Sequence, residues 1–182
     1  MSQSVAAATM TERCVARPET VYDILADLWS HLEWAGARQS PDYRLLTIDA
    51  PDGPARVGTV FTSTGTLPGS KLHWEDRSEV TVADRPSAFD FITEGEVAAR
   101  RIMRARWLNR YEIVPLETGC VVHHKLALLE VANPLTRLRV PLLRWTAFQV
   151  AIPKLSGRGL RNLVAFAEAQ QSRIAVASAA ET

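Results

Sequence analysis

The chain has 182 residues, of which 47% are apolar and 23% charged, and its formal net charge is +1. This length is typical of a single domain that buries its own core without disulfides or a structural metal. A charge balance near zero and the lack of a nucleic-acid-binding motif argue against nucleic acid as a partner. No apolar run reaches the length of a membrane span, and "MSQSVAAATM" lacks the basic start and apolar core of a signal peptide. With only Cys14 and Cys120 as cysteines, we expect a cytoplasmic protein.

The charges are distributed unevenly. Residues 1–99 carry 8 basic and 15 acidic side chains, and residues 100–182 carry 13 and 5. A solvated helix face explains most basic clusters of this kind. However, the stretch 133–145, "NPLTRLRVPLLRW", alternates Arg and Leu as interfacial segments do, so peripheral membrane contact through 133–145 stays open. A homodimer is also left open.

The first predicted elements are a strand and two short helices. About ten residues at each end are rich in Ala, Ser and Thr and are expected to be flexible, which leaves one domain over residues 11–172. A strand is predicted over Thr11–Val15, and Pro18 suits the first turn of a helix. This helix has an apolar face at the spacing i, i+3, i+4, i+7, formed by Val21, Ile24, Leu25 and Leu28. Ser30 and Glu33 stand at capping-box spacing, which predicts the start of a second short helix.

The middle of the chain is predicted to be β-structure. Turn signals such as "APDGPARVG" and "LPGS" separate apolar runs. The predicted strands are Tyr43–Ile48, Val57–Leu67, Lys71–Val82, Ala88–Thr93, Ile102–Val114 and Cys120–Val131. Because short links join most of them, neighbouring strands are expected to be antiparallel.

The alternation of side chains predicts which face of this sheet is buried. In "MRARWLNRYEI" all odd positions except Asn109 are apolar or aromatic, and all even positions except Leu108 are charged, so the odd positions are predicted to face inward. They are Met103, Ala105, Trp107, Asn109, Tyr111 and Ile113. The same count turns further residues inward, while His73 faces outward: Leu72, Trp74, Asp76, Val80, Val82, Phe89, Phe91, Thr93, Cys120, Val122, His124, Leu126 and Leu128.

A long C-terminal helix, about Thr146 to Ser172 with a kink near Pro153, is predicted to cover this face. Its apolar stripe contains Phe148, Ile152, Leu155, Ser156, Gly159, Leu163 and Phe166. Gly159 stands at the centre of the stripe, where a glycine costs about 1 kcal/mol relative to alanine. Two explanations remain open at this point, close approach of the helix to the sheet and room for a ligand.

Several stretches, taken in order, resemble one superfamily. They are "VARPETVYDILADLWSHLEW", "VGTVFTSTG", "HWEDRSEVTVADRPSAFDF", "RWLNRYEIVPLETGCVVHHKLAL" and "LSGRGLRNLVAFAE". Together they resemble the SRPBCC superfamily (START, birch-pollen-allergen and polyketide cyclase proteins), most of all its bacterial polyketide cyclase/dehydrase-like branch. The resemblance implies an α+β helix-grip fold. In this fold a curved, seven-stranded antiparallel sheet, two short helices and one long C-terminal helix enclose a cavity.

The resemblance also implies that the cavity binds a hydrophobic small molecule, such as a lipid or a polyketide. One alternative is a polyketide cyclase, aromatase or dehydratase, and another is a lipid transfer protein acting at a membrane surface. The fold alone does not decide among them. The candidate ligand-binding residues are Trp74, Asp76, Phe89, Phe91, Trp107, Asn109, Tyr111, His124, Leu126, Leu155, Ser156, Gly159 and Leu163.

The sequence contains few signs of catalysis. There is no GxSxG, HExxH or phosphate-binding glycine loop. His123 and His124 point to opposite faces of their strand and cannot bind one metal together, so we expect no metal and no cofactor. If the protein is an enzyme, His124 is the best candidate for proton transfer by its ordinary pKa, with Asn109 and Tyr111, or Asp76, as companions. Each inward polar side chain is otherwise satisfied by the protein itself or turned toward a ligand or water.

Overall fold

The fold is built around one antiparallel sheet. The computed structural model describes residues 6–39, 44–66, 73–97, 103–132 and 152–180. Its seven strands are arranged in the order β1-β7-β6-β5-β4-β3-β2. Their bounds are β1 Ala6–Cys14, β2 Leu45–Asp49, β3 Val60–Thr66, β4 His73–Asp84, β5 Ala88–Val97, β6 Met103–Pro115 and β7 Cys120–Val131. All neighbouring strands are antiparallel, which confirms the predicted sheet.

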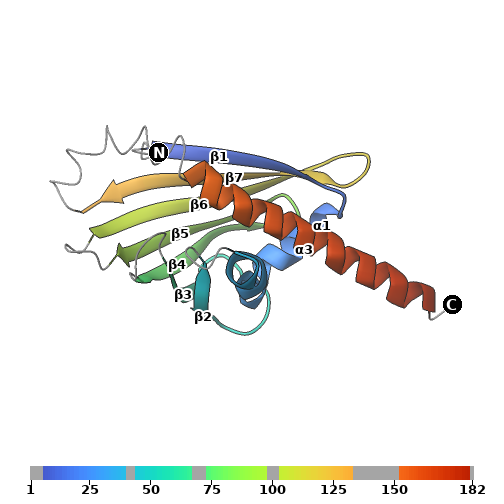
Figure 1. The fold of residues 1–182 in the computed structure, drawn as a ribbon, viewed down its shortest axis with the longest axis horizontal. Coiled ribbons are helices and arrows are strands. Elements are labelled where there is room, and N and C mark those ends of the chain that lie inside the picture. Colours follow the sequence, from blue (N-terminus) through green and yellow to red (C-terminus); the bar gives the residue numbers. More distant parts are fainter. Residues whose placement is uncertain (1–5, 40–43, 67–72, 98–102, 133–151, 181–182) are drawn as a thin grey trace.

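A long helix lies across one face of the sheet. This helix, α3, spans Ile152–Ala180 and continues beyond the edge of the sheet at its C-terminal end (Figure 1). Leu160, Leu163 and Ala167 of α3 are buried, as an amphipathic helix on an apolar sheet face requires. Pro153 lies in its first described turn. Residues 133–151 lie outside the described residues. They include Phe148, the basic segment 133–145 and the part of the predicted helix before Pro153, so the kink predicted there is not described.

Both terminal elements are longer than predicted. β1 begins at Ala6 rather than at Thr11, because Ala6, Ala8 and Met10 alternate toward the core opposite β7. α3 continues past Ser172 to Ala180, and there its apolar side chains are exposed, Ile174 at 50% and Val176 at 71%. The start of β1 at Ala6 is difficult to predict from the sequence, because alanine has a low strand propensity and small side chains give only a weak alternation pattern.

The two short helices are a support at one end of the sheet. α1 spans Pro18–Ala26, and its predicted apolar face is completely buried. A 3₁₀ turn, η1 (Leu28–Ser30), and a π-helical segment, η2 (Leu32–Ala37), follow it directly. The predicted capping box is wrong: the Ser30 hydroxyl donates to the carbonyl of Ile24 (2.8 Å), and no side chain of the described residues accepts a hydrogen bond from the first backbone N–H groups of η2. Asn162 of α3 donates to the Trp34 carbonyl (3.1 Å) and so links η2 to α3.

Among the side chains that the structure describes, the predicted alternation holds with one exception; the predicted inward side chains of Leu72 and Met103 lie outside this set. A β-bulge between Val80 and Val82 shifts the register of β4, so that Val82 pairs with Asp90 and Ala83 pairs with Phe89. Val82 was predicted to face inward, and this prediction is wrong because one extra residue reverses the faces beyond the bulge. His73 is exposed, as predicted. No helix in the described ranges is long and apolar enough to cross a membrane.

Candidate functional site

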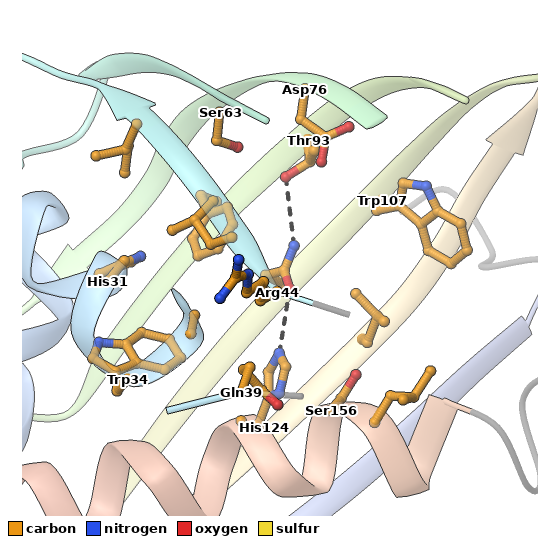
Figure 2. A pocket seen from close by; sticks show the side chains of 18 of the residues that line it. His31, Trp34, Gln39, Arg44, Ser63, Asp76, Thr93, Trp107, His124 and Ser156 are labelled. Carbon is orange, nitrogen blue, oxygen red and sulfur yellow. Dashed lines mark hydrogen bonds between the residues drawn. The ribbon is translucent and has the colours of Figure 1, made fainter. Parts of the chain in front are cut away.

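A cavity of about 400 Å³ lies between the inner face of the sheet, α3 and η2 (Figure 2). Of the thirteen candidate ligand-binding residues predicted from the sequence, all except Phe89 and Leu163 line this cavity. They come from β4 (Trp74, Asp76), β5 (Phe91), β6 (Trp107, Asn109, Tyr111), β7 (His124, Leu126) and α3 (Leu155, Ser156, Gly159). Residues far apart in the sequence therefore meet because antiparallel pairing places their inward positions side by side.

Phe89 and Leu163 lie outside the cavity lining. Both side chains are completely buried. Phe89 packs edge-to-face against Tyr22 of α1, with ring centroids 6.0 Å apart. The inward direction of these residues was predicted well, but α1 fills the space at this end of the sheet, so an inward residue there belongs to the core.

Other lining residues were missed. They are His31, Trp34, Ala35, Gln39, Arg44, Leu45, Ile48, Phe61, Ser63, Thr93 and Leu160. Alternation along β3 could have identified Phe61 and Ser63, and Thr93 was already predicted to face inward. No pattern pointed to Trp34 or Gln39, since their approach to the cavity depends on how η2 packs against the sheet.

Aromatic side chains form much of the cavity wall. Phe91 contacts Phe61 in an edge-to-face arrangement (5.5 Å between centroids) and lies 6.4 Å from Tyr111. The Trp74 indole lies over Gly65 of the neighbouring strand, where any Cβ would collide with it. Flat apolar walls with a few polar groups are the usual composition of a small-molecule site.

One set of polar groups in the cavity forms its own hydrogen bonds. His124 Nε2 donates to Asn109 Oδ1 (3.3 Å), and Asn109 Nδ2 makes a long contact with Thr93 Oγ1 (3.5 Å), as the dashed lines in Figure 2 show. The Thr93 hydroxyl is 2.9 Å from that of Ser78. The His124 ring also stacks in parallel on Tyr111, with centroids 4.2 Å apart. These side chains satisfy one another across four strands, as buried polar groups must.

Burial changes which group is best suited to transfer protons. Desolvation lowers the pKa of His124 to about 3, so the imidazole is neutral at physiological pH and a weak base. The pKa of His31 is lowered to about 4 for the same reason, and its Nε2 donates to the Leu25 carbonyl (3.0 Å). Desolvation raises the pKa of Asp76 to about 7. A group that exchanges protons works best with a pKa near the working pH, so the structure favours Asp76 over His124 in this role.

A second set of polar groups has no hydrogen-bond partner among the described residues. Ser63 and Asp76 are directly opposite each other on β3 and β4. Neither side chain makes a hydrogen bond or ion pair within the described part of the chain. Room for the carboxyl comes from Gly95 on β5, because a Cβ at Gly95 would collide with Asp76 Oδ1. Ser63 is 8% exposed, and both residues face the cavity (Figure 2).

The open side of the cavity is marked by Arg44, which lines it and is exposed to solvent. Gln39 reaches the opposite wall, where a Cβ at Gly159 would lie 2.9 Å from Gln39 Nε2. No sheet atom of the described residues lies within 4 Å of that Cβ position. Gly157, which precedes Gly159 by two residues and so points to a different side of α3, is the glycine near the sheet: a Cβ at Gly157 would lie 3.7 Å from Met10 Cγ. Gly159 therefore leaves space in the cavity rather than permitting close helix–sheet contact.

The described residues contain no cluster of three or more His, Cys, Asp or Glu side chains that could hold a metal ion. His123 points away from the cavity and bonds Thr11 Oγ1 through Nδ1 (2.9 Å), while His124 faces inward, which confirms that they occupy opposite faces. Cys14 and Cys120 are both buried and both free.

The fold recurs in solved structures with little sequence similarity. An uncharacterized protein from Rhizobium leguminosarum matches with a TM-score of 0.63 at 12% identity, over 90% of this chain and 94% of that one. A protein from Mycobacterium smegmatis has a TM-score of 0.60 at 16% identity, over 91% and 93% of the two chains. A Thermus thermophilus protein has a TM-score of 0.59 at 16% identity, over 90% and 98%. Neither a family model nor a curated protein matches the sequence. At these identities the comparisons show the fold, which is compatible with a helix-grip architecture.

Proposed function

We propose that this protein binds a hydrophobic small molecule in the cavity and that it is an SRPBCC-type carrier or sensor. The observation that carries the proposal is the lining itself: Trp74, Trp107, Phe91 and Tyr111 surround a space of about 400 Å³ beneath α3. Such a space suits a ligand of one or two fused rings or a short lipid chain. The sequence resemblance to the superfamily supports the same function.

Binding can be tested by native mass spectrometry and thermal melting. The purified protein is first examined for a bound molecule, and the stripped protein is then melted with fatty acids, quinones and aromatic polyketides. A ligand at a hundredfold excess over its Kd stabilises the native state by about 2.7 kcal/mol. For a chain of this size the melting temperature should rise by roughly 5–10 °C.

A matched pair of variants on α3 locates the site. Ser156 faces the cavity, whereas Arg158 is exposed on the other side of the same helix. Ser156→Phe should fill the cavity and abolish the thermal shift, while Arg158→Phe should leave it unchanged. Equal shifts in both variants, or no bound molecule and no shift with any compound, would contradict the proposal.

A second candidate function is cyclase- or dehydratase-type chemistry on a polyketide. It is favoured by the presence of Asp76, whose pKa of about 7 suits proton exchange, in the same cavity as the linked His124 and Asn109. Such an enzyme should convert a poly-β-keto thioester into a cyclised product that is detectable by mass spectrometry. Asp76→Asn should remove this activity while thermal shifts with non-reactive ligands persist; turnover unaffected by this change would rule out Asp76 as the proton-exchanging group.

A further inference from the structure

Two sets of polar side chains on the sheet differ in whether the protein satisfies their hydrogen bonds. Ser78, Thr93, Asn109 and His124 are hydrogen-bonded to one another. Ser63 and Asp76 are adjacent across β3 and β4, face the same space, and have no partner among the residues that the structure describes. Unpaired polar groups that face a cavity obtain their hydrogen bonds from water or from a ligand.

From this geometry we infer that Ser63 and Asp76 form a polar subsite that donates hydrogen bonds to a carbonyl oxygen of the cavity ligand. A carbonyl oxygen has two lone pairs, so it can accept from the Ser63 hydroxyl and from a protonated Asp76 carboxyl together. This inference rests on the proposed function, and it adds the chemical class of the ligand: a ring-bearing ketone, quinone or similar neutral carbonyl compound.

The surroundings favour a neutral ligand over a cationic one. An amine would require an ionised Asp76 and would place two charges in an apolar space, where the loss of hydration offsets much of their attraction. The burial that raises the pKa of Asp76 to about 7 stabilises the neutral acid, which is a hydrogen-bond donor. The other titratable groups lining the cavity are His31 and His124, which are neutral above pH 6, the Tyr111 phenol, and Arg44 at the open side.

Four compounds that share the naphthalene ring system distinguish a neutral carbonyl ligand from an apolar, a cationic and an anionic one: naphthalene, 2-acetylnaphthalene, 2-naphthylmethylamine and 2-naphthoate. Affinities are measured by isothermal titration calorimetry from pH 6 to pH 8. We expect 2-acetylnaphthalene to bind about three- to tenfold more tightly than naphthalene at pH 6, as one or two net hydrogen bonds allow. This advantage should decline toward pH 8 as Asp76 ionises, whereas the affinity of naphthalene should stay constant.

Three variants test the residues themselves. Asp76→Asn keeps a donor of nearly the same shape, so it should retain the preference for the ketone and lose the dependence on pH. Asp76→Ala should remove most of the preference, and Ser63→Ala should reduce it in part. Melting curves without ligand establish that each variant is folded, and Asp76→Asn, which changes no volume, keeps the test decisive if Asp76→Ala does not fold.

Each other outcome would overturn the inference. Tighter binding of the amine at higher pH, lost in Asp76→Asn, would mean that Asp76 acts as an anion. Tighter binding of 2-naphthoate, lost in Arg44→Gln, would place the polar group of the ligand at Arg44. Equal affinity for naphthalene and the ketone would show that Ser63 and Asp76 do not select the ligand, although the cavity would still bind hydrophobes. If none of the four compounds binds, both the inference and the proposed function fail.

Discussion

Arg110 Nε lies 2.7 Å from Asp90 Oδ2 on the outer face of the sheet, and the arginine covers a carboxylate whose side chain is only 3% exposed. The second oxygen of Asp90, Oδ1, is buried without a hydrogen-bond partner within the described residues. Burial raises the pKa of Asp90, and Arg110 lowers it in part. The ion pair with Arg110 therefore compensates the buried charge of Asp90, unlike an ion pair between two solvent-exposed side chains.

Removing Arg110 should destabilise the fold. We expect Arg110→Ala to lower the free energy of unfolding by about 1–3 kcal/mol at pH 7, because it leaves a buried carboxylate uncompensated. Urea unfolding followed by circular dichroism measures the difference. Arg110→Ala combined with Asp90→Asn should recover much of the loss; a double variant as unstable as the single one would mean that the packing of the arginine, not its charge, matters.

The contact between Asp76 and Gly95 should be sensitive to one methyl group. Gly95→Ala places a Cβ where the Asp76 carboxyl now lies, so one of them must move. We expect a loss of about 1–3 kcal/mol, typical of overpacking a filled position, in a thermal or urea melt. In an Asp76→Ala background the same change should cost far less, since the colliding group is gone. Additive losses in the double variant would mean that the two residues do not compete for this space.

The two glycines of α3 should respond in opposite ways. Gly159→Leu meets only the flexible end of Gln39, so the variant should gain roughly 0.8–1 kcal/mol from helix propensity, keep its fold and lose ligand binding. Gly157→Leu extends toward Met10 of β1 and should cost about 1–3 kcal/mol. Differential scanning calorimetry compares the two. A clearly lower melting temperature for Gly159→Leu would mean that α3 is tightly packed there and that the cavity lies elsewhere.

His124 should make stability fall in acid. Its folded pKa of about 3 lies below the ordinary 6.5, so the unfolded chain binds a proton first as the pH decreases. This contribution is fully present above pH 6.5 and is lost below it by up to about 1.4 kcal/mol per pH unit. Urea unfolding at pH 7 and pH 5 measures the effect: between these pH values the free energy of unfolding of His124→Gln should decrease less than that of the wild type. Parallel curves would mean that His124 is not desolvated.

Asp76 should make the stability of the fold decrease as the pH rises, opposite to the effect of His124. Its folded pKa of about 7 lies above the ordinary 3.8, so its contribution to stability is fully present below pH 3.8 and is lost as the pH rises through 7. Asp76→Asn cannot ionise, so its stability relative to the wild type should increase from pH 5 to pH 8. A constant difference across this range would indicate that Asp76 is well hydrated.

Periodicity alone determined the main elements of this protein. Alternation at period two in "MRARWLNRYEI" identified the inner face of β6, and the spacing of Val21, Ile24, Leu25 and Leu28 identified α1, because side-chain direction repeats with the local backbone geometry. Nearest-neighbour pairing of consecutive strands then followed from the short links between them. The candidate residues on β4 to β7 were therefore predictable from the sequence.

Contacts between distant segments decided the rest. The bulge at Val82, the bond of Ser30 to Ile24 and the approach of Trp34 and Gln39 to the cavity depend on packing that no local pattern encodes. The same is true of chemistry: an ordinary pKa ranks His124 above Asp76, whereas burial reverses that order. Desolvation is a property of everything that surrounds a group, so the availability of Ser63 and Asp76 to a ligand emerges only when β3, β4, β5 and α3 are assembled.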